Sequence, residues 1–137
     1  MTLKATKDTN SIFLGWTGAC NKTLTTCIVI VDGTKTATAT FRLKQFALKV
    51  TLSGNKGGTV TSDIAGINCG TDCVENYFHG TVVTLTPIAN EGSEFLRWSG
   101  ACTGNAPTCV VTMTKFKSVT AKFQLIKRHA QLFFLKR

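Results

Sequence analysis

The strongest constraint on the fold is that the chain repeats itself at an interval of 82 residues. Without a gap, residues 2–43 align with residues 84–125 and are identical at 17 of 42 positions. The identities fall on glycine, cysteine, aromatic and apolar positions, and the clearest pair of segments is Phe13-Leu14-Gly15-Trp16-Thr17-Gly18-Ala19-Cys20 and Phe95-Leu96-Arg97-Trp98-Ser99-Gly100-Ala101-Cys102. One architecture is therefore built twice.

The first copy begins halfway through the repeated unit. A complete repeat spans residues 46–125, residues 1–43 correspond to the second half of a preceding repeat, and Lys44-Gln45 joins the two. Residues 126–137 form a basic and apolar C-terminal tail without a counterpart. Because the repeat is already under way at Thr2, we interpret the chain as a segment of a longer protein with Met1 added. A native short chain is the alternative.

Strand patterns dominate the sequence. Residues 46–52 alternate between large apolar and smaller or polar side chains, which is the period of a half-buried strand. Residues 81–86 are rich in β-branched side chains and are predicted to form a strand that stops at Pro87. In residues 118–123 the pattern turns Val119, Ala121 and Phe123 inward. No segment sustains a helical period, so we predict an all-β chain.

Six cysteines form three closely spaced pairs, Cys20/Cys27, Cys69/Cys73 and Cys102/Cys109. The even count, and the recurrence of one pair in both copies, predict disulfides made in an oxidising compartment. Closing a loop of about eight residues contributes roughly 2.5 kcal/mol in the chain-entropy model. Zinc is the alternative, although only His79 and His129 offer nitrogen ligands and no C-x-x-C knuckle is present.

Four recurring aromatic residues are predicted to lie in the core, namely Trp16, Trp98, Phe41 and Phe123. An aromatic ring beside a disulfide usually packs beneath it as part of the core. The alternative for the two tryptophans is an exposed platform on which sugars stack.

The charge is strongly positive and unevenly distributed. The formal net charge is +9, and no acidic residue follows Glu94. A field of one sign favours anionic partners, and the candidate contacts in the tail are Lys127, Arg128, Lys136 and Arg137. The alternative is a basic surface without a specific partner.

The tail also carries the apolar strip Leu132-Phe133-Phe134-Leu135. Such a β-prone segment could add to an open sheet edge of another copy, and the incomplete first repeat could supply that edge. This arrangement would make the chain a filament subunit. Alternatively, the tail folds back on its own repeat or is frayed.

Catalytic and metal-binding patterns are weak. Asp63, Asp72 and Glu75 flank the Cys69/Cys73 loop and could hold calcium, but three acids in a surface loop are also ordinary solvated side chains. His79 could act as a base, yet no nucleophile elbow surrounds Ser99 or Ser118. We therefore expect no enzyme and no cofactor.

Two runs together carry a family resemblance, Gly66-Ile67-Asn68-Cys69-Gly70-Thr71-Asp72-Cys73 and Trp98-Ser99-Gly100-Ala101-Cys102, followed by Val119-Thr120-Ala121-Lys122-Phe123. The chain resembles the divergent internalin B-repeat family over residues 46–125, and over the half present in residues 2–43. The resemblance implies a β-grasp-like repeat module of bacterial surface or secreted proteins, without catalytic residues.

The sequence thus predicts tandem small modules stapled by short-loop disulfides, the first of them incomplete. The expected function is a non-enzymatic structural or adhesion module, located outside the bacterial cell or on its surface. One alternative is a filament subunit assembled by strand exchange. The other is a module that binds anionic glycan, lipid or nucleic acid, of which nucleic acid is the least favoured. Expected partners are other copies or neighbouring repeats, and an anionic cell-surface polymer, and no apolar run is long enough to span a membrane.

Overall fold

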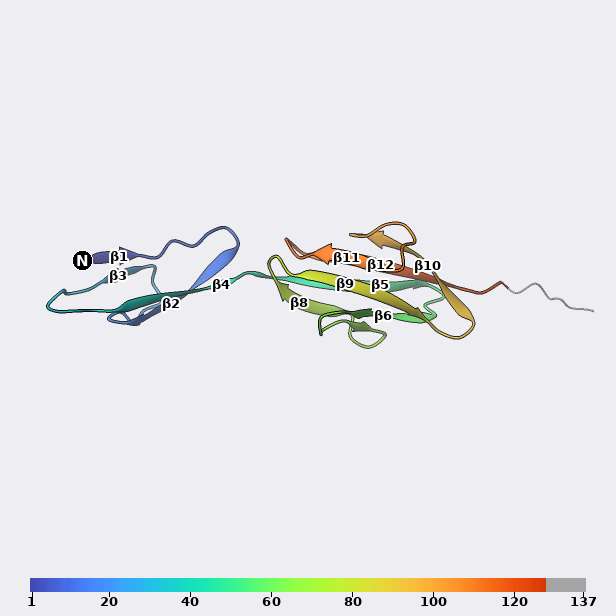
Figure 1. The fold of residues 1–137 in the computed structure, drawn as a ribbon, viewed down its shortest axis with the longest axis horizontal. Coiled ribbons are helices and arrows are strands. Elements are labelled where there is room, and N and C mark those ends of the chain that lie inside the picture. The colour runs from blue at the N-terminus through green and yellow to red at the C-terminus, as the bar shows by residue number, and fades with distance from the viewer. Residues whose placement is uncertain (128–137) are drawn as a thin grey trace, which may run out of the picture. The chain divides into compact units, whose positions relative to one another are not determined.

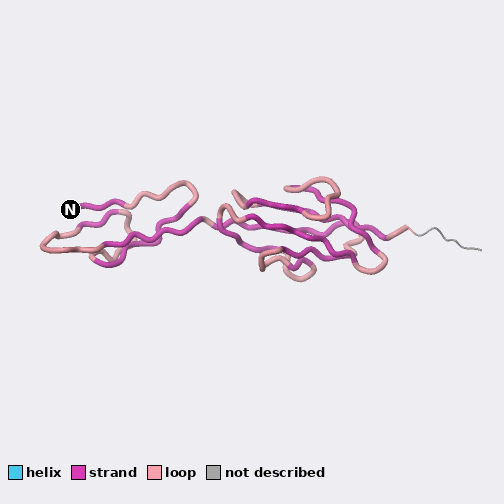
Figure 2. Tube along the Cα trace, viewed as in Figure 1, coloured by secondary structure: helices cyan, strands magenta, loops and turns pink. Residues whose placement is uncertain are grey.

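The computed structural model describes residues 1–127, and every regular element in this range is a strand (Figure 1, Figure 2). In chain order the strands are β1 (Thr2–Lys4), β2 (Ser11–Gly18), β3 (Thr26–Ile28), β4 (Ala37–Leu43), β5 (Gln45–Gly54), β6 (Gly58–Ser62), β7 (Asn68–Cys69), β8 (Val74–Phe78), β9 (Val82–Ala89), β10 (Ser93–Gly100), β11 (Cys109–Thr112) and β12 (Lys117–Leu125). The described part of the chain contains no helix able to cross a membrane.

The chain divides into two compact units. The first unit is Met1–Gln45 and the second unit is Phe46–Arg137. The division falls at Lys44-Gln45, the segment where the sequence predicts the junction between repeats. Only Lys44 separates the end of β4 from the start of β5.

The second unit is a sandwich of two four-stranded sheets. One sheet has the order β10-β12-β5-β8, and the other has the order β11-β9-β6-β7. In the first of these, β12 lies between β10, to which it is antiparallel, and β5, to which it is parallel. We call it the mixed sheet, and we call the second, whose pairs are antiparallel, the antiparallel sheet. The first and last strands of the unit are therefore direct neighbours.

The core of the second unit lies between the two sheets. Val119, Ala121 and Phe123 of β12 are completely buried, as the alternation in the sequence predicts. They meet side chains from β5 and from the antiparallel sheet, namely Leu48, Val50, Val60, Val83 and Leu85. Full burial of one such large apolar side chain contributes roughly 1.5–3 kcal/mol, so this cluster is the main source of stability in the unit.

The predicted end of a strand at Pro87 is wrong, because β9 continues through it to Ala89. β11 pairs with β9 only as far as Leu85, whereas β6 pairs with residues 85–89. Beyond Leu85, β9 thus has a neighbouring strand on one side only. Pro87 lies opposite Val60 in this stretch, where a missing N–H can face away from the ladder.

The first unit repeats the second half of the second unit in its backbone pairing. It consists of the two-stranded sheets β1-β3 and β2-β4. The pairing shifts in register after Phe13 in β2 and after Phe95 in β10. The equivalent cross-strand pairs are Leu3 with Cys27 and Leu85 with Cys109, and Phe13 with Phe41 and Phe95 with Phe123. The repeat interval in the sequence is therefore also a repeat of register.

A glycine after each tryptophan strand is required by the backbone. Gly18 and Gly100 have φ values of 85° and 88°, which side chains rarely adopt. A Cβ atom at either position would overlap the carbonyl oxygen of Thr36 or Ser118. Those carbonyls accept hydrogen bonds from the N–H groups of Ala19 and Ala101, at 2.7 and 2.9 Å. The Gly-Ala-Cys sequence is thus part of a tight turn.

The structure confirms the predicted all-β class and the disulfide-stapled repeats. In the second unit the core face of the mixed sheet is covered by the antiparallel sheet. A sandwich of these two sheets therefore describes the unit more closely than the β-grasp-like module that the resemblance implies.

Candidate functional site

The disulfides connect the two sheets of each unit. Cys20 follows β2 and is bonded to Cys27 in β3, with 6.1 Å between their Cα atoms. Cys102 follows β10 and is bonded to Cys109 in β11, with a Cα separation of 5.9 Å. In both copies the bond joins the sheet that carries the tryptophan to the opposite sheet. The staple therefore holds the two layers together across the core.

The third disulfide has the same effect at the other side of the second unit. Cys69 belongs to β7 in the antiparallel sheet, and Cys73 directly precedes β8 in the mixed sheet. The N–H of Val50 donates to the carbonyl oxygen of Cys73 at 2.8 Å, which fixes this connection to β5. All cysteines of the chain are paired as the sequence predicts, and none is free to bind zinc.

Each tryptophan is locked in place by the loop that its disulfide closes. Trp98 is 1% exposed, and its Nε1 donates to the carbonyl oxygen of Ala106 at 2.9 Å. Trp16 is 7% exposed and makes the equivalent bond to Leu24 at 2.9 Å. Buried rings cannot serve as stacking surfaces, so the alternative of an exposed sugar platform is wrong.

The first unit leaves uncovered several positions that are core positions in the second. Phe41 is 38% exposed, whereas its equivalent Phe123 is completely buried. Val31 is 62% exposed, whereas its equivalent Met113 is completely buried. The prediction that Phe41 is a core aromatic therefore differs from the structure. Phe41 still contacts Phe13 at a ring-centroid distance of 5.4 Å, but the first unit has no strands equivalent to β5 and β6 to cover it.

Two sheet edges of the first unit have no partner strand within residues 1–127. In the second unit β12 pairs on both sides, with β10 and with β5, whereas β4 pairs with β2 alone. Likewise β9 pairs with β11 and β6, whereas β1 pairs with β3 alone. The free edges of β4 and β1 are those to which strands like β5 and β6 would add.

A hollow of about 250 Å³ lies between these edges and is lined by Met1, Leu3, Val29, Val31, Lys35 and Ala37. We call it the apolar socket. In the second unit the equivalents of five of its lining residues are buried in the core, namely Val83, Leu85, Val111, Met113 and Val119. The apolar socket is therefore the part of a repeat core that remains open in the first unit.

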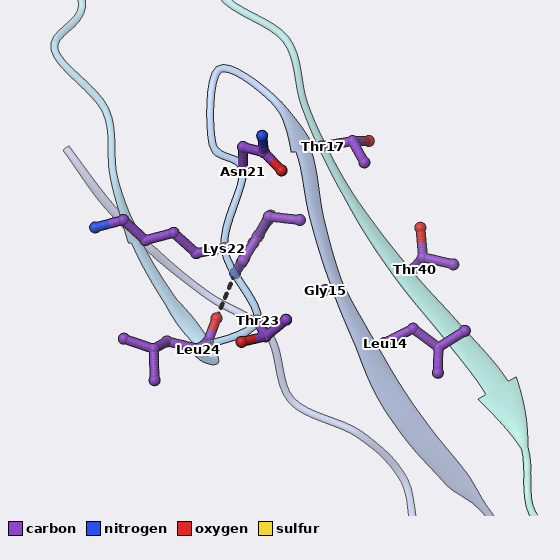
Figure 3. A pocket seen from close by; sticks show the side chains of 9 residues that line it. Leu14, Gly15, Thr17, Asn21, Lys22, Thr23, Leu24 and Thr40 are labelled. Carbon is purple, nitrogen blue, oxygen red and sulfur yellow. Dashed lines mark hydrogen bonds between the residues drawn. The ribbon is translucent and has the colours of Figure 1, made fainter.

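A second and larger hollow, of about 680 Å³, lies beside Trp16 (Figure 3). Its walls are strands β2 and β4, which carry Leu14, Thr17 and Thr40, and the loop that carries Lys22 and Leu24. The dashed line in Figure 3 is the hydrogen bond from Trp16 to Leu24. The lining offers hydroxyl and amide groups and one ammonium group, but no carboxylate or imidazole. It could hold a polar ligand, yet it contains no acid–base pair.

The acidic residues near the third disulfide have structural contacts. Asp63 accepts a hydrogen bond from the N–H of Thr84 at 2.8 Å.

Tyr77 is a buried tyrosine close to these acidic residues. The Tyr77 hydroxyl lies 3.4 Å from the Ser62 hydroxyl and 3.3 Å from the Ala65 carbonyl oxygen. Burial raises the pKa of Tyr77, and nearby carboxylates add to the effect. Within residues 1–127, no group of three or more histidine, cysteine, aspartate or glutamate side chains could hold a metal ion.

Part of the predicted basic region lies on the outer face of the mixed sheet. Arg97 of β10 is directly opposite Lys122 of β12. Lys49 of β5 points outward, because its neighbours Leu48 and Val50 point into the core. We call these three residues the basic face. Their equivalents in the first unit include Gly15 and Thr40, so the basic face belongs to the second unit alone.

Most of the predicted tail contacts lie outside the described residues. Lys127 follows β12 within the described range. The others lie beyond it, namely Arg128, Leu132, Phe133, Phe134, Leu135, Lys136 and Arg137.

The sequence analysis did not predict the apolar socket or the exposure of Val31. The repeat alignment pairs Val31 with Met113. That Met113 is buried and Val31 exposed becomes evident only when the strands are paired.

The fold and its staples define a tandem β-sandwich repeat in which disulfides cross-link the layers. A family model described as a divergent InlB B-repeat domain matches residues 1–45 and 48–127, and the chain belongs to this family. Comparison with curated proteins and with solved structures gives no significant match.

Proposed function

We propose that the chain is a force-bearing spacer module of a bacterial surface or secreted protein. The observation that carries this proposal is the pairing of β5 with β12. These are the first and last strands of the second unit, and they are hydrogen-bonded neighbours in parallel orientation from Lys117 opposite Leu48 to Phe123 opposite Gly54.

The parallel pairing determines how tension loads the unit. A pull on the chain ends draws β5 toward its N-terminal end and β12 toward its C-terminal end. In a parallel pair these directions are opposed along the strand axis, so the hydrogen bonds between the strands are sheared together. In a peeling geometry the same bonds would break one after another. The arrangement thus supports a role in which the module transmits force.

Membership in the InlB B-repeat family and the three disulfides support a location outside the bacterial cell. Disulfides persist in oxidising surroundings and limit the conformational freedom of a stretched or opened chain. The hollow beside Trp16 has no acid–base pair, which supports a non-enzymatic role.

Single-molecule force spectroscopy on the full chain tests the proposal. Pulled through its two ends, the second unit should unfold in one event at high force. The matched control attaches one handle at Asn55, in the turn after β5, instead of at the N-terminus. Both handles then act on the same end of the β5–β12 pair, and the unfolding force should fall severalfold. Equal forces in the two geometries would refute the shear mechanism.

Direct adhesion to an anionic polymer is a second candidate function, and the basic face favours it. Arg97 lies opposite Lys122, and across the β5–β12 pair Lys122 and Lys49 lie opposite Ser53 and Ser118. We propose a sulfated polysaccharide as the probe. Binding should weaken steeply with salt and weaken further in the Arg97→Gln/Lys122→Thr variant, which reduces the charge toward that of the first unit. An affinity that changes neither with salt concentration nor with these two substitutions would contradict the proposal.

A further inference from the structure

The hollow beside Trp16 has a loop wall that is held in place before any ligand binds. The Cys20–Cys27 disulfide closes the loop. The N–H of Trp16 donates to the carbonyl oxygen of Lys22 at 2.8 Å, and Trp16 Nε1 donates to that of Leu24 at 2.9 Å. The loop is thus held at three points, and the volume of about 680 Å³ is typical of small-molecule sites, which span about 300–1,000 Å³.

The second unit has the same frame with a different lining. The N–H of Trp98 donates to Gly104 at 2.7 Å and its Nε1 donates to Ala106 at 2.9 Å, as the equivalent atoms do in the first unit. Of the nine residues that line the hollow, only Leu14 and Trp16 recur at the equivalent positions of the second unit. Every wall of the hollow therefore has a counterpart in the second unit, and the two copies differ in the side chains that the walls carry.

The hollow is open because two of its lining positions carry small residues. Gly15 of β2 and Thr40 of β4 lie directly opposite each other on the strands that form one wall (Figure 3). Their counterparts Arg97 and Lys122 also lie opposite each other. Where the second unit carries two long cationic side chains, the first unit has a glycine and a short hydroxyl side chain. Room for a ligand is therefore specific to the first unit.

The lining has the chemistry of a saccharide site. It offers three hydroxyl groups and one amide group, from Thr17, Thr23, Thr40 and Asn21. Hydroxyl and amide groups can both donate and accept hydrogen bonds, as the hydroxyl groups of a sugar do. Leu14, which is 46% exposed, adds an apolar surface for the C–H groups of a sugar ring.

The charge of the first unit favours an acidic ligand. Residues 1–45 carry six basic and two acidic side chains, a formal charge of +4, and one of the acids, Asp32, is paired with Lys35 at 2.9 Å. Lys22 is among the nine lining residues, and none of the nine carries a carboxylate. In Figure 3 its ammonium group points away from the strands, but this exposed and flexible side chain can turn over the opening to meet an anion.

We propose that the hollow beside Trp16 binds an acidic saccharide, a sugar of the uronic acid class. The sugar hydroxyls bond to the threonine and asparagine side chains, and the carboxylate pairs with Lys22. The buried ring of Trp16 fixes the loop and does not stack on the sugar. This site goes beyond the spacer function and is separate from the basic face, which belongs to the second unit. With one ion pair at an open surface, a disaccharide should bind with a Kd on the order of 1 mM.

The experiment titrates the full chain, labelled with ¹⁵N, with digalacturonate and follows the amide shifts. Signals of Gly15 and Thr40 should move. The Arg97→Gln/Lys122→Thr variant is titrated in parallel, because it removes two charges of the basic face and leaves every lining residue of the hollow in place. The shifts at Gly15 and Thr40 should be the same in both proteins. The methyl ester of the disaccharide lacks the charge and should bind about three- to tenfold more weakly.

Two pairs of substitutions at exposed positions provide matched controls, and all four should leave the unit folded. Lys22→Gln should weaken digalacturonate binding about three- to tenfold and leave binding of the methyl ester unchanged, whereas Lys7→Gln removes the same charge outside the hollow and should have little effect. Thr40→Met fills the hollow and should weaken binding of both sugars. Thr38→Met, at the preceding outward position of β4, should not.

The outcomes separate clearly. Shifts at the hollow, preference for the acid, and selective losses in Lys22→Gln and Thr40→Met would support the proposal. No shift at Gly15 and Thr40 at concentrations well above the expected Kd, equal affinity for acid and ester, or equal effects within either pair would overturn it. Equal shifts with acetate alone would reveal an ion contact and would also overturn the saccharide assignment. The force measurement and the salt dependence of the basic face do not depend on these signals, so either proposed function can fail while this site stands.

Discussion

Replacing Phe123 or Phe41 by alanine measures how much unfolding free energy the same phenylalanine contributes in the complete and in the incomplete repeat. The two residues occupy equivalent positions, opposite Phe95 in β10 and Phe13 in β2 respectively. Phe123 is completely buried, and its ring packs against Gly58 so closely that a Cβ atom there would overlap it. Phe41 has the same backbone setting but is 38% exposed.

The expected costs follow from this difference. Removing a fully buried phenylalanine costs about 3–5 kcal/mol, because the transfer free energy is lost and a cavity remains. At Phe41 part of the ring is already in water and no closed cavity forms, so the cost should be about 1–2 kcal/mol. Phe123→Ala should therefore destabilise the second unit by about 1–4 kcal/mol more than Phe41→Ala destabilises the first.

Hydrogen exchange followed by mass spectrometry measures the two effects separately, because peptides from each unit report its own opening free energy. The full chain is used for both variants, and the unit without the substitution serves as the internal reference. Equal losses in the two units would refute the reasoning. That result would mean that Phe41 is covered in solution as Phe123 is.

Three further predictions concern the staples, the tight turn and the buried tyrosine. Replacing Cys102 and Cys109 together by alanine should lower the unfolding free energy of the second unit by about 2.5 kcal/mol in urea titrations; an unchanged midpoint would contradict the cross-link argument. Gly100→Ala should cost more than Gly92→Ala in the same assay, since both glycines have positive φ but only at Gly100 would a Cβ atom overlap another residue, the Ser118 carbonyl oxygen. The raised pKa of Tyr77 means that the folded state favours the neutral phenol, so its contribution is present below a pH of about 10 and is lost as the pH rises through the folded pKa. Above about pH 10 the wild type should therefore lose stability more steeply than Tyr77→Phe, and parallel pH profiles of the two proteins would contradict this sign.

The alignment could point to the apolar socket and to Phe41, but it could not show that they are uncovered. The alignment identifies the missing half-repeat and pairs Phe41 with Phe123. Residue pattern alone then predicts equal burial of the two, because alternation reports which face of a strand a side chain occupies. It does not report whether a second layer covers that face. Burial depends on strands that are distant in sequence, and only their pairing shows that Phe41 and Val31 remain exposed.

The sequence by itself determined the local and periodic features of this protein. The repeat interval, the inward alternation of residues 119–123 and the short cysteine spacings can be read along the chain without knowing which strands are neighbours. Tertiary structure alone decided which strands are adjacent. The parallel pairing of β5 with β12, the continuation of β9 through Pro87 and the role of the disulfides as links between layers all depend on neighbours far apart in the sequence. The physical reason is that a strand presents two hydrogen-bonding edges of similar chemistry, so the choice of partner is made by the packing of the whole core.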